Sequence, residues 1–150
     1  MGNLFIEADK NEIINRIDEL HPNSKPMWGK MSVAQMLAHC VHPIKVALGE
    51  HKLGHSLIGK LIGKRFKNKM MQDDYVFQRN LPTPKTFRVL NEPDFYESQQ
   101  ALKEIIQRVY DTDKNAITQR PHPFFGKMTV DEWGILGYKH LDHHLRQFDV

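Results

Sequence analysis

Apolar residues recur at helical spacing in four separate segments of this 150-residue chain, and no run alternates between apolar and polar residues as a strand would. A chain of this length forms one ordinary domain, which buries enough surface to need neither a disulfide nor a metal to hold its core. The expected fold is therefore a single all-α domain over residues 1–150. We expect a four-helix bundle with a short extra basic helix between its second and third helices.

Capping residues and prolines give approximate limits for the four segments. We expect them to begin near Asp9, Ser32, Pro93 and Thr129, and to end near His21, Gly49, Tyr110 and Val150. Glu12, Gln35 and Glu132 stand three residues after the first, second and fourth of these starts, which is the spacing of a capping box. Pro43 should kink the second helix, because proline lacks a backbone donor and clashes with the preceding turn.

Two parts of the chain are nearly the same sequence. Residues 29–35 read Gly-Lys-Met-Ser-Val-Ala-Gln, residues 126–132 read Gly-Lys-Met-Thr-Val-Asp-Glu, and a His-Pro pair precedes each. The second and fourth helices should therefore begin in the same way. Either one good loop-to-helix solution is used twice, or the two halves of the bundle are related by pseudo-symmetry. Two copies are too few for a solenoid.

The extra helix contains Leu-Ile-Gly-Lys twice in succession, at residues 57–64, and is followed by more cations. Its Gly59 and Gly63 indicate close contact with a neighbouring element. The basic run Lys60–Lys69 is interpreted first as a solvated face. It could also form a clamp for an anionic substrate or thiol, through Lys60, Lys64 and Arg65. Binding to nucleic acid or a lipid surface is disfavoured, because the net charge is only +3.

The apolar runs, the first ten residues and the cysteine content indicate the compartment and the partners of the protein. No apolar run approaches the roughly 18 residues of a membrane span, and the first ten residues do not resemble a signal peptide. Cys40 is the single cysteine, which excludes internal disulfides and fits a reducing compartment. We therefore expect a cytoplasmic protein without membrane or nucleic-acid partners. Cys40 lies on the apolar face of its helix, so we interpret it as a small hydrophobe rather than a nucleophile.

Nine histidines are the unusual feature of the composition. His140 and His144 lie near the centre of the apolar face of the last helix, and side chains four residues apart on a helix are neighbours. Such a pair can hold one metal ion between the two rings. The alternative is two core histidines, each with its own hydrogen-bond partner. His143 lies about 60–100° round the helix from the pair, so we expect it at an interface or exposed.

A third ligand must come from another helix, and periodicity moderately favours His39. This residue lies on the flank of the apolar face of the second helix, whereas His42 points almost directly away from that face. We interpret the remaining histidines as solvated or capping groups: His21, His51, His55 and His122. No inward carboxylate is apparent as a fourth ligand. Asp142 lies about 100° round the helix from the histidine pair, so it could at most support a ligand and not bind the ion itself.

Four motifs resemble a known family. The segment Trp28-Gly-Lys-Met-Ser-Val-Ala-Gln-Met-Leu-Ala-His39, followed by His140-x-x-x-His144, resembles the DinB-like metal-binding four-helix bundles. The stretches Asn80-Leu-Pro-Thr-Pro and His122-Pro-Phe-Phe-Gly-Lys-Met-Thr look like an uncharacterised branch of that superfamily. The order and placement of the motifs carry the resemblance, which spans most of the chain.

The resemblance implies a divalent ion bound by His39, His140 and His144, and a homodimer. Zinc or nickel suits histidine ligands best, and iron or copper also fits. Some relatives resemble transferases or isomerases that use low-molecular-weight thiols, so such a thiol is a candidate cofactor. The expected function is a metal-dependent enzyme acting on a small molecule, as a thiol-dependent transferase or a hydrolase. The alternative is a non-catalytic metal-binding or interaction protein, and the sequence does not identify catalytic residues.

Overall fold

The computed structural model describes the backbone of residues 1–51, 57–118 and 121–150, and the side chains of these ranges except at 57–61 and 118. Within these ranges the chain is all-helical and contains no strand. Six α-helices and one 3-10 turn follow in order: α1 (Glu7–Asp18), α2 (Val33–Ala47), α3 (Leu57–Met70), η1 (Lys85–Phe87), α4 (Phe95–Asp111), α5 (Lys114–Thr118) and α6 (Val130–Gln147).

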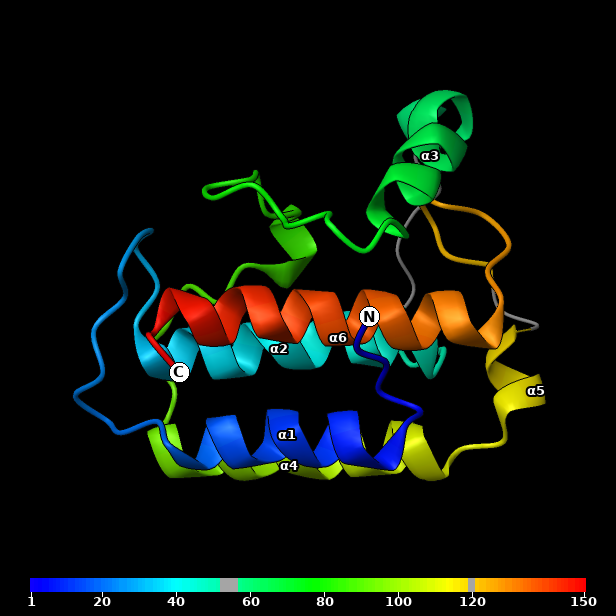
Figure 1. The fold of residues 1–150 in the computed structure, drawn as a ribbon. Coiled ribbons are helices and arrows are strands. Elements are labelled where there is room, and N and C mark those ends of the chain that lie inside the picture. Colours follow the sequence, from blue (N-terminus) through cyan, green and yellow to red (C-terminus); the bar gives the residue numbers. More distant parts are fainter. Residues whose placement is uncertain (52–56, 119–120) are drawn as a thin grey trace.

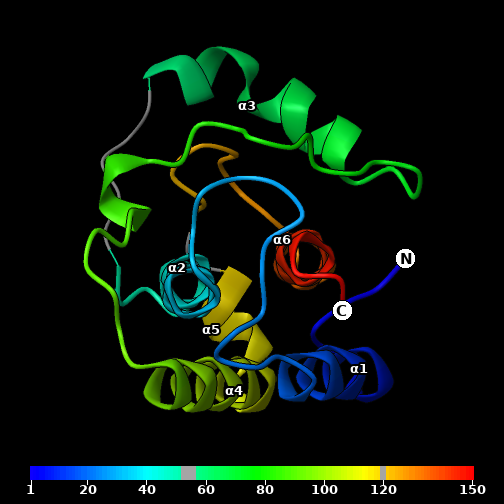
Figure 2. The same ribbon diagram turned by 90° about the vertical axis from the view of Figure 1, so that its left-hand side faces the viewer.

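Helices α1, α2, α4 and α6 lie lengthwise against one another around a common core (Figure 1). Seen from one end, their order round the core is α1, α4, α2, α6, so the connection from α1 to α2 crosses a diagonal (Figure 2). α2 and α6 are antiparallel neighbours. The long connection from α2 to α4 carries α3 and η1 across the outer side of this pair, which leaves α1 and α4 on the opposite side.

The core confirms the helical periodicity. Ile13, Ile17 and Leu20 belong to the apolar stripe expected in the first helix. The first two are completely buried, and Leu20, two residues after the end of α1, is 2% exposed. The other fully buried side chains of the four packed helices are Met36, Leu37, Cys40, Leu102, Ile106, Leu141 and Leu145. The core is thus drawn from every helix of the packed set, and the segment that crosses over α2 and α6 adds the buried side chains of Met70 and Phe87.

α2 and α6 begin in the same way, as the repeated sequence predicts. Ser32 and Thr129 are the N-caps, and each forms a complete capping box with the residue three positions later. Gly29 and Gly126, three residues before the caps, both have a positive φ, of 82° and 74°. A side chain is strained in this conformation, so the two glycines permit the same turn into the two neighbouring helices.

The predicted capping pair of the first helix, Asp9 with Glu12, is wrong. α1 begins at Glu7 rather than Asp9, and its N-cap, Ile6, makes no side-chain capping bond. The carboxylate of Asp9 instead accepts a hydrogen bond from the backbone N–H of Asn3 at 2.8 Å. The segment before the helix therefore folds back against the first turn of α1. The carboxylate of Asp9 pairs with a backbone N–H of this segment and not with one of the free N–H groups at the helix start.

Two features of the other helices depart from the sequence pattern or refine it. α5 was not predicted, because five residues are too few for a periodic signal; its Ile117 is nevertheless completely buried. α2 is assigned as one helix through Pro43 and ends before Gly49, whose φ of 73° confirms the predicted stop. Among the described helices, none combines the length and apolar character that a bilayer span requires.

α3 is attached to the loop before α6 through a glycine and two aromatic rings. A Cβ on Gly63 would collide with the backbone carbonyl of Phe124, so this glycine allows the helix to lie directly on the loop. The ring of Phe66 is stacked on that of Phe125, with centroids 6.1 Å apart. The expected close contact is confirmed at Gly63, whereas the side-chain surroundings of Gly59 lie outside the described residues.

The basic run is divided between a tertiary contact and an exposed surface. Lys67 forms an ion pair with Glu132, the capping-box residue of α6, at 2.8 Å. The exposed cations of the run are Lys64, Arg65 and Lys69. These three fit the interpretation of a solvated face, and the side chain of Lys60 lies outside the described part of the chain.

Candidate metal centre

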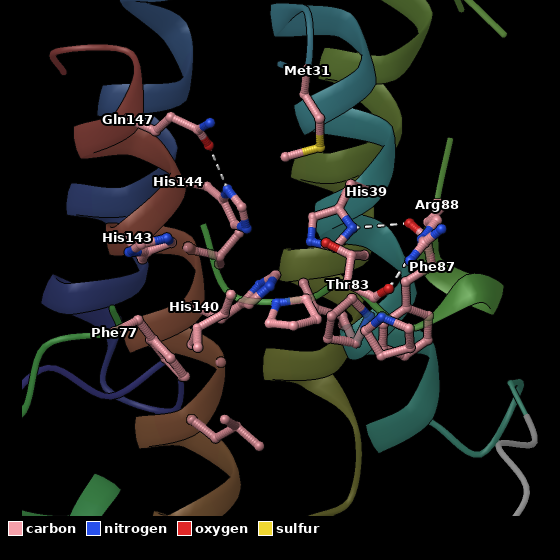
Figure 3. A pocket seen from close by; sticks show the side chains of 18 of the residues that line it. Met31, His39, Phe77, Thr83, Phe87, Arg88, His140, His143, His144 and Gln147 are labelled. Carbon is pink, nitrogen blue, oxygen red and sulfur yellow. Dashed lines mark hydrogen bonds between the residues drawn. The ribbon is translucent and has the colours of Figure 1, made fainter. Parts of the chain in front are cut away.

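Three histidines from two helices meet between α2 and α6 (Figure 3). One ring nitrogen each of His39, His140 and His144 lies within 4.8 Å of the other two. The ring centroids are 5.2 Å apart for His39 and His140, and 4.7 Å apart for His140 and His144. Nitrogens that share one zinc ion lie about 3–4 Å apart, because each bond is about 2.1 Å long. The three rings therefore stand close to the spacing of a metal site.

His39 is held by a backbone carbonyl. Its Nδ1 lies 3.0 Å from the carbonyl oxygen of Phe87, the last residue of η1. A carbonyl only accepts hydrogen bonds, so Nδ1 carries the proton and Nε2 keeps its lone pair. The side chain is 4% exposed, and η1 orients it from outside the α2–α6 pair. This is the arrangement that commonly orients histidine ligands of metals.

His144 is held by a chain of two hydrogen bonds. Its Nδ1 lies 2.9 Å from Oε1 of Gln147, and Nε2 of Gln147 donates to the carbonyl oxygen of Trp28 at 2.7 Å. The second bond fixes which end of the amide faces the histidine. Nδ1 of His144 must therefore donate, which leaves Nε2 with a lone pair directed away from Gln147.

His140 differs from the other two histidines. Among the described residues, no hydrogen bond to either of its ring nitrogens is present, and the ring packs edge-on to Phe77 with centroids 6.4 Å apart. Its ring lies beside those of His39 and His144. Nε2 of His39 and Nε2 of His144 are therefore acceptors at the centre. The neutral ring of His140 has one N–H and one acceptor, and a cation would bind this acceptor together with the other two.

Burial keeps the three histidines neutral at neutral pH. Desolvation lowers the pKa of His144 to about 3, and it also lowers the pKa of His39. The pKa of His140 is well below its ordinary value, first because of burial and then because the two neighbouring histidines oppose a third positive charge. Neutral imidazole is the form that binds a metal, so the site is prepared for an ion without first losing protons.

These shifts predict how the stability of the metal-free protein depends on pH. The folded pKa of each of the three histidines lies below the unfolded value of about 6.5. The unfolded chain therefore binds more protons below that pH, and the free energy of unfolding should fall as the pH drops from about 6.5 towards 4. Thermal unfolding at pH 7, 6 and 5 measures this. A His140→Gln/His144→Gln variant should show a shallower pH dependence, and equal slopes would contradict the prediction.

The centre opens into a cavity of about 890 Å³. The cavity lies between α2, α6 and the connection that crosses them, and Met31, Phe77 and Thr83 line it beside the histidines (Figure 3). Neither Lys64 nor Arg65 lines it. An anion clamp over the cavity therefore has no support from the described side chains of the basic run.

His143 and His122 lie where the sequence places them. His143 is half-buried between the rings of Trp28 and Phe77, at 5.7 Å and 5.9 Å between centroids, which confirms an interfacial position. Nδ1 of His122 accepts hydrogen bonds from the backbone N–H groups of Phe124 and of the following residue, so His122 is a capping group. His21 is exposed, and His55 lies outside the described residues.

His42 and His51 form a second contact that the sequence does not predict. The ring of His42 is stacked on that of Phe87, with centroids 5.7 Å apart, and His51 packs against both. His51 is thus half-buried in an aromatic group rather than solvated or capping. These rings contact the side chain of Phe87, whereas His39 is held by the backbone carbonyl of that residue.

Two other sequence candidates do not belong to the centre. Asp142 forms ion pairs with Arg16 at 2.9 Å and with Arg146 at 3.0 Å, so its carboxylate is engaged with these arginines and the supporting role considered for it is wrong. Cys40 is 1% exposed, and burial raises the pKa of its thiol far above the ordinary value. This confirms that Cys40 is a small core residue.

Comparison with known proteins assigns the chain to a family. The sequence matches the family described as "Protein of unknown function (DUF1569)" over residues 3–150. The chain belongs to this family. The match covers nearly the whole chain, including the three histidines of the centre, and the family description names no activity. No curated protein and no solved structure matches the chain.

Sequence reasoning missed the groups that orient the histidines. Gln147 stands three residues after His144 on the same helix, so helical spacing is a signal that could have identified it. The carbonyl groups of Phe87 and Trp28 leave no signal in the sequence, because every residue has one and only the tertiary fold selects which carbonyl is used.

Gln147 offers a direct test of this supporting network. Gln147→Ala removes the acceptor for Nδ1 of His144, so a zinc ion held by the three histidines should bind about 10- to 100-fold more weakly. Competition with a chromophoric chelator measures the affinity, and circular dichroism shows that each variant remains folded. Gln100→Ala, on the exposed face of α4, is the matched control. Equal zinc affinity in both variants would show that the network does not orient the ring.

Proposed function

We propose that the protein binds one divalent metal ion through a ring nitrogen of each of His39, His140 and His144. The observation that supports this most directly is the pair of Nδ1–H hydrogen bonds on His39 and His144, which leave both Nε2 lone pairs free. In an ordinary core, histidines in such close contact would share protons or meet donors. Here the Nδ1–H donors of His39 and His144 point to the outer sides of their rings.

The chemistry of the ligands limits the choice of metal. Three neutral imidazoles favour zinc or nickel, and iron or copper also fits. Three protein ligands leave at least one coordination position for water or substrate, which is the pattern of catalytic rather than structural zinc sites. The cavity beside the histidines gives a small molecule access to that position.

We infer a metal-dependent enzyme that acts on a small molecule, as a thiol-dependent transferase or a hydrolase. A bound divalent ion would lower the pKa of a water or thiol towards neutrality. The chain's own residues hold the three rings in place and surround the reacting groups with apolar walls. The resemblance to DinB-like bundles supports this proposal, and with it a homodimer in the cytoplasm.

Cobalt spectroscopy distinguishes an enzyme from a non-catalytic metal-binding protein. Cobalt-loaded protein should show visible absorption bands, and a small thiol such as 2-mercaptoethanol should add a charge-transfer band by occupying the open position. The His140→Ala/His144→Ala variant should show neither. Visible bands that no thiol or anion alters would indicate a saturated site and favour the non-catalytic alternative.

A further inference from the structure

The walls of the cavity are mostly apolar and aromatic. Trp28, Met31, Phe77 and Phe87 lie at the end that contains the three histidines, and Leu136 lies on α6 one turn before His140. A volume of about 890 Å³ is near the upper end of the range for small-molecule sites. A strongly hydrated ligand would lose its water against mostly apolar walls. The lining therefore favours a ligand with a substantial apolar body.

The charges around the cavity have a single sign. Among the described residues that line it there is no aspartate or glutamate, and the charged ones are Lys30 and Arg88. Nε of Arg88 donates to the carbonyl oxygen of Thr83 at 3.1 Å, which holds the guanidinium at the rim (Figure 3). Imidazole ligands add no negative charge, so a bound ion keeps its full 2+ charge. An ammonium group would meet only positive charges, whereas an acidic group would neutralise them.

We propose that this cavity binds an organic monoanion with an aromatic or aliphatic body, its acidic head at the three histidines and its body along α6. The head position rests on the metal site of the proposed function. Leu136 and Trp133 precede His140 by one and two turns of α6, and both line the cavity. Two turns of helix separate Trp133 from His140, so the wall accommodates a body about 10 Å long.

Four probes of related shape test the proposal on zinc-loaded full-length protein. They are 4-phenylbutyrate, 4-phenylbutylamine, 4-phenylbutan-1-ol and acetate, compared by isothermal titration calorimetry. The dissociation constant of 4-phenylbutyrate should be at least about tenfold lower than that of each other probe, because it alone has both the charge and the body. Equal binding of the amine or the alcohol would overturn the charge argument, and equal binding of acetate would overturn the role of the apolar wall.

A pair of variants locates the body of the ligand. Leu136→Gln should weaken 4-phenylbutyrate binding by about tenfold and leave acetate binding unchanged. Ile62→Gln is the control, because Ile62 is 50% exposed on α3 and does not line the cavity. Equal effects of the two variants would overturn the placement.

The zinc content of every sample separates the two proposals. Wild-type protein that takes up neither zinc nor any other divalent transition metal overturns the proposed function and this inference together. Zinc-loaded protein without a preference for the anion overturns this inference alone.

Discussion

Replacing any one of the three histidines by alanine is expected to lower the affinity for zinc by about 100-fold or more, which corresponds to about 3 kcal/mol. The loss should be large because each ring supplies one of three ligands in the proposed site, and the water that would replace it is a weaker ligand. His39→Ala, His140→Ala and His144→Ala should behave alike although His39 comes from another helix. Competition with a chelator of known affinity measures the change.

Two neighbouring histidines provide the controls for this prediction. His143→Ala removes a ring that packs on Trp28 and Phe77, and His42→Ala removes one that stacks on Phe87. Neither ring belongs to the group of three, so both variants should keep zinc affinity within about threefold of the wild type. A loss as large as that of His140→Ala in either control would place the metal elsewhere.

Ile106→Ala is expected to lower the free energy of unfolding by about 3 kcal/mol without changing zinc affinity. Ile106 lies on α4, is completely buried, and leaves a cavity when truncated. Urea denaturation of the metal-free protein measures the loss, and chelator competition measures the zinc affinity. Because α4 supplies no ligand, the second measurement should not change.

Leu90→Ala is the matched control for the core, because Leu90 is 88% exposed. Its effect on the free energy of unfolding should stay within about 0.5 kcal/mol. A small effect of Ile106→Ala, similar to that of Leu90→Ala, would contradict the packing of α4 in the core.

The helices were predictable where local signals and burial agree. Ile13, Ile17 and Leu20 stand four and three residues apart, which places them on one side of a helix but on both faces of a strand. The capping boxes at Ser32 and Thr129 depend on residues three positions apart. The start of α1 was not predictable in this way. Asp9 has the residue type of a cap, and the competing partner that takes its carboxylate, the N–H of Asn3, is identified only by the folded structure.

The candidate centre was predictable in part. The proximity of His140 and His144 follows from helix geometry alone, since both lie on α6. The approach of His39 depends on how α2 is rotated against α6, and periodicity placed this residue only on the flank of its helix. The resemblance to DinB-like bundles selected it, and the structure brings its ring nitrogen to the other two.

The cavity could not be predicted at all. Its outer wall comes from the connection between α3 and α4, which has no helical or strand period and includes Phe77, Thr83 and Phe87. Such a segment is positioned by tertiary contacts, among them the hydrogen bond between Nδ1 of His39 and the carbonyl of Phe87. The aromatic wall and the absence of carboxylates among the described lining residues therefore emerged only from the structure.

Elemental analysis of untagged protein, purified without chelators, tests the metal centre most directly. The wild type should contain about one equivalent of a divalent transition metal per chain, either as purified or after dialysis against zinc. The His140→Ala/His144→Ala variant, shown by circular dichroism to be folded, should contain almost none. Stoichiometric metal in the double variant, or a wild-type chain that takes up no metal, would contradict a metal centre formed by His39, His140 and His144.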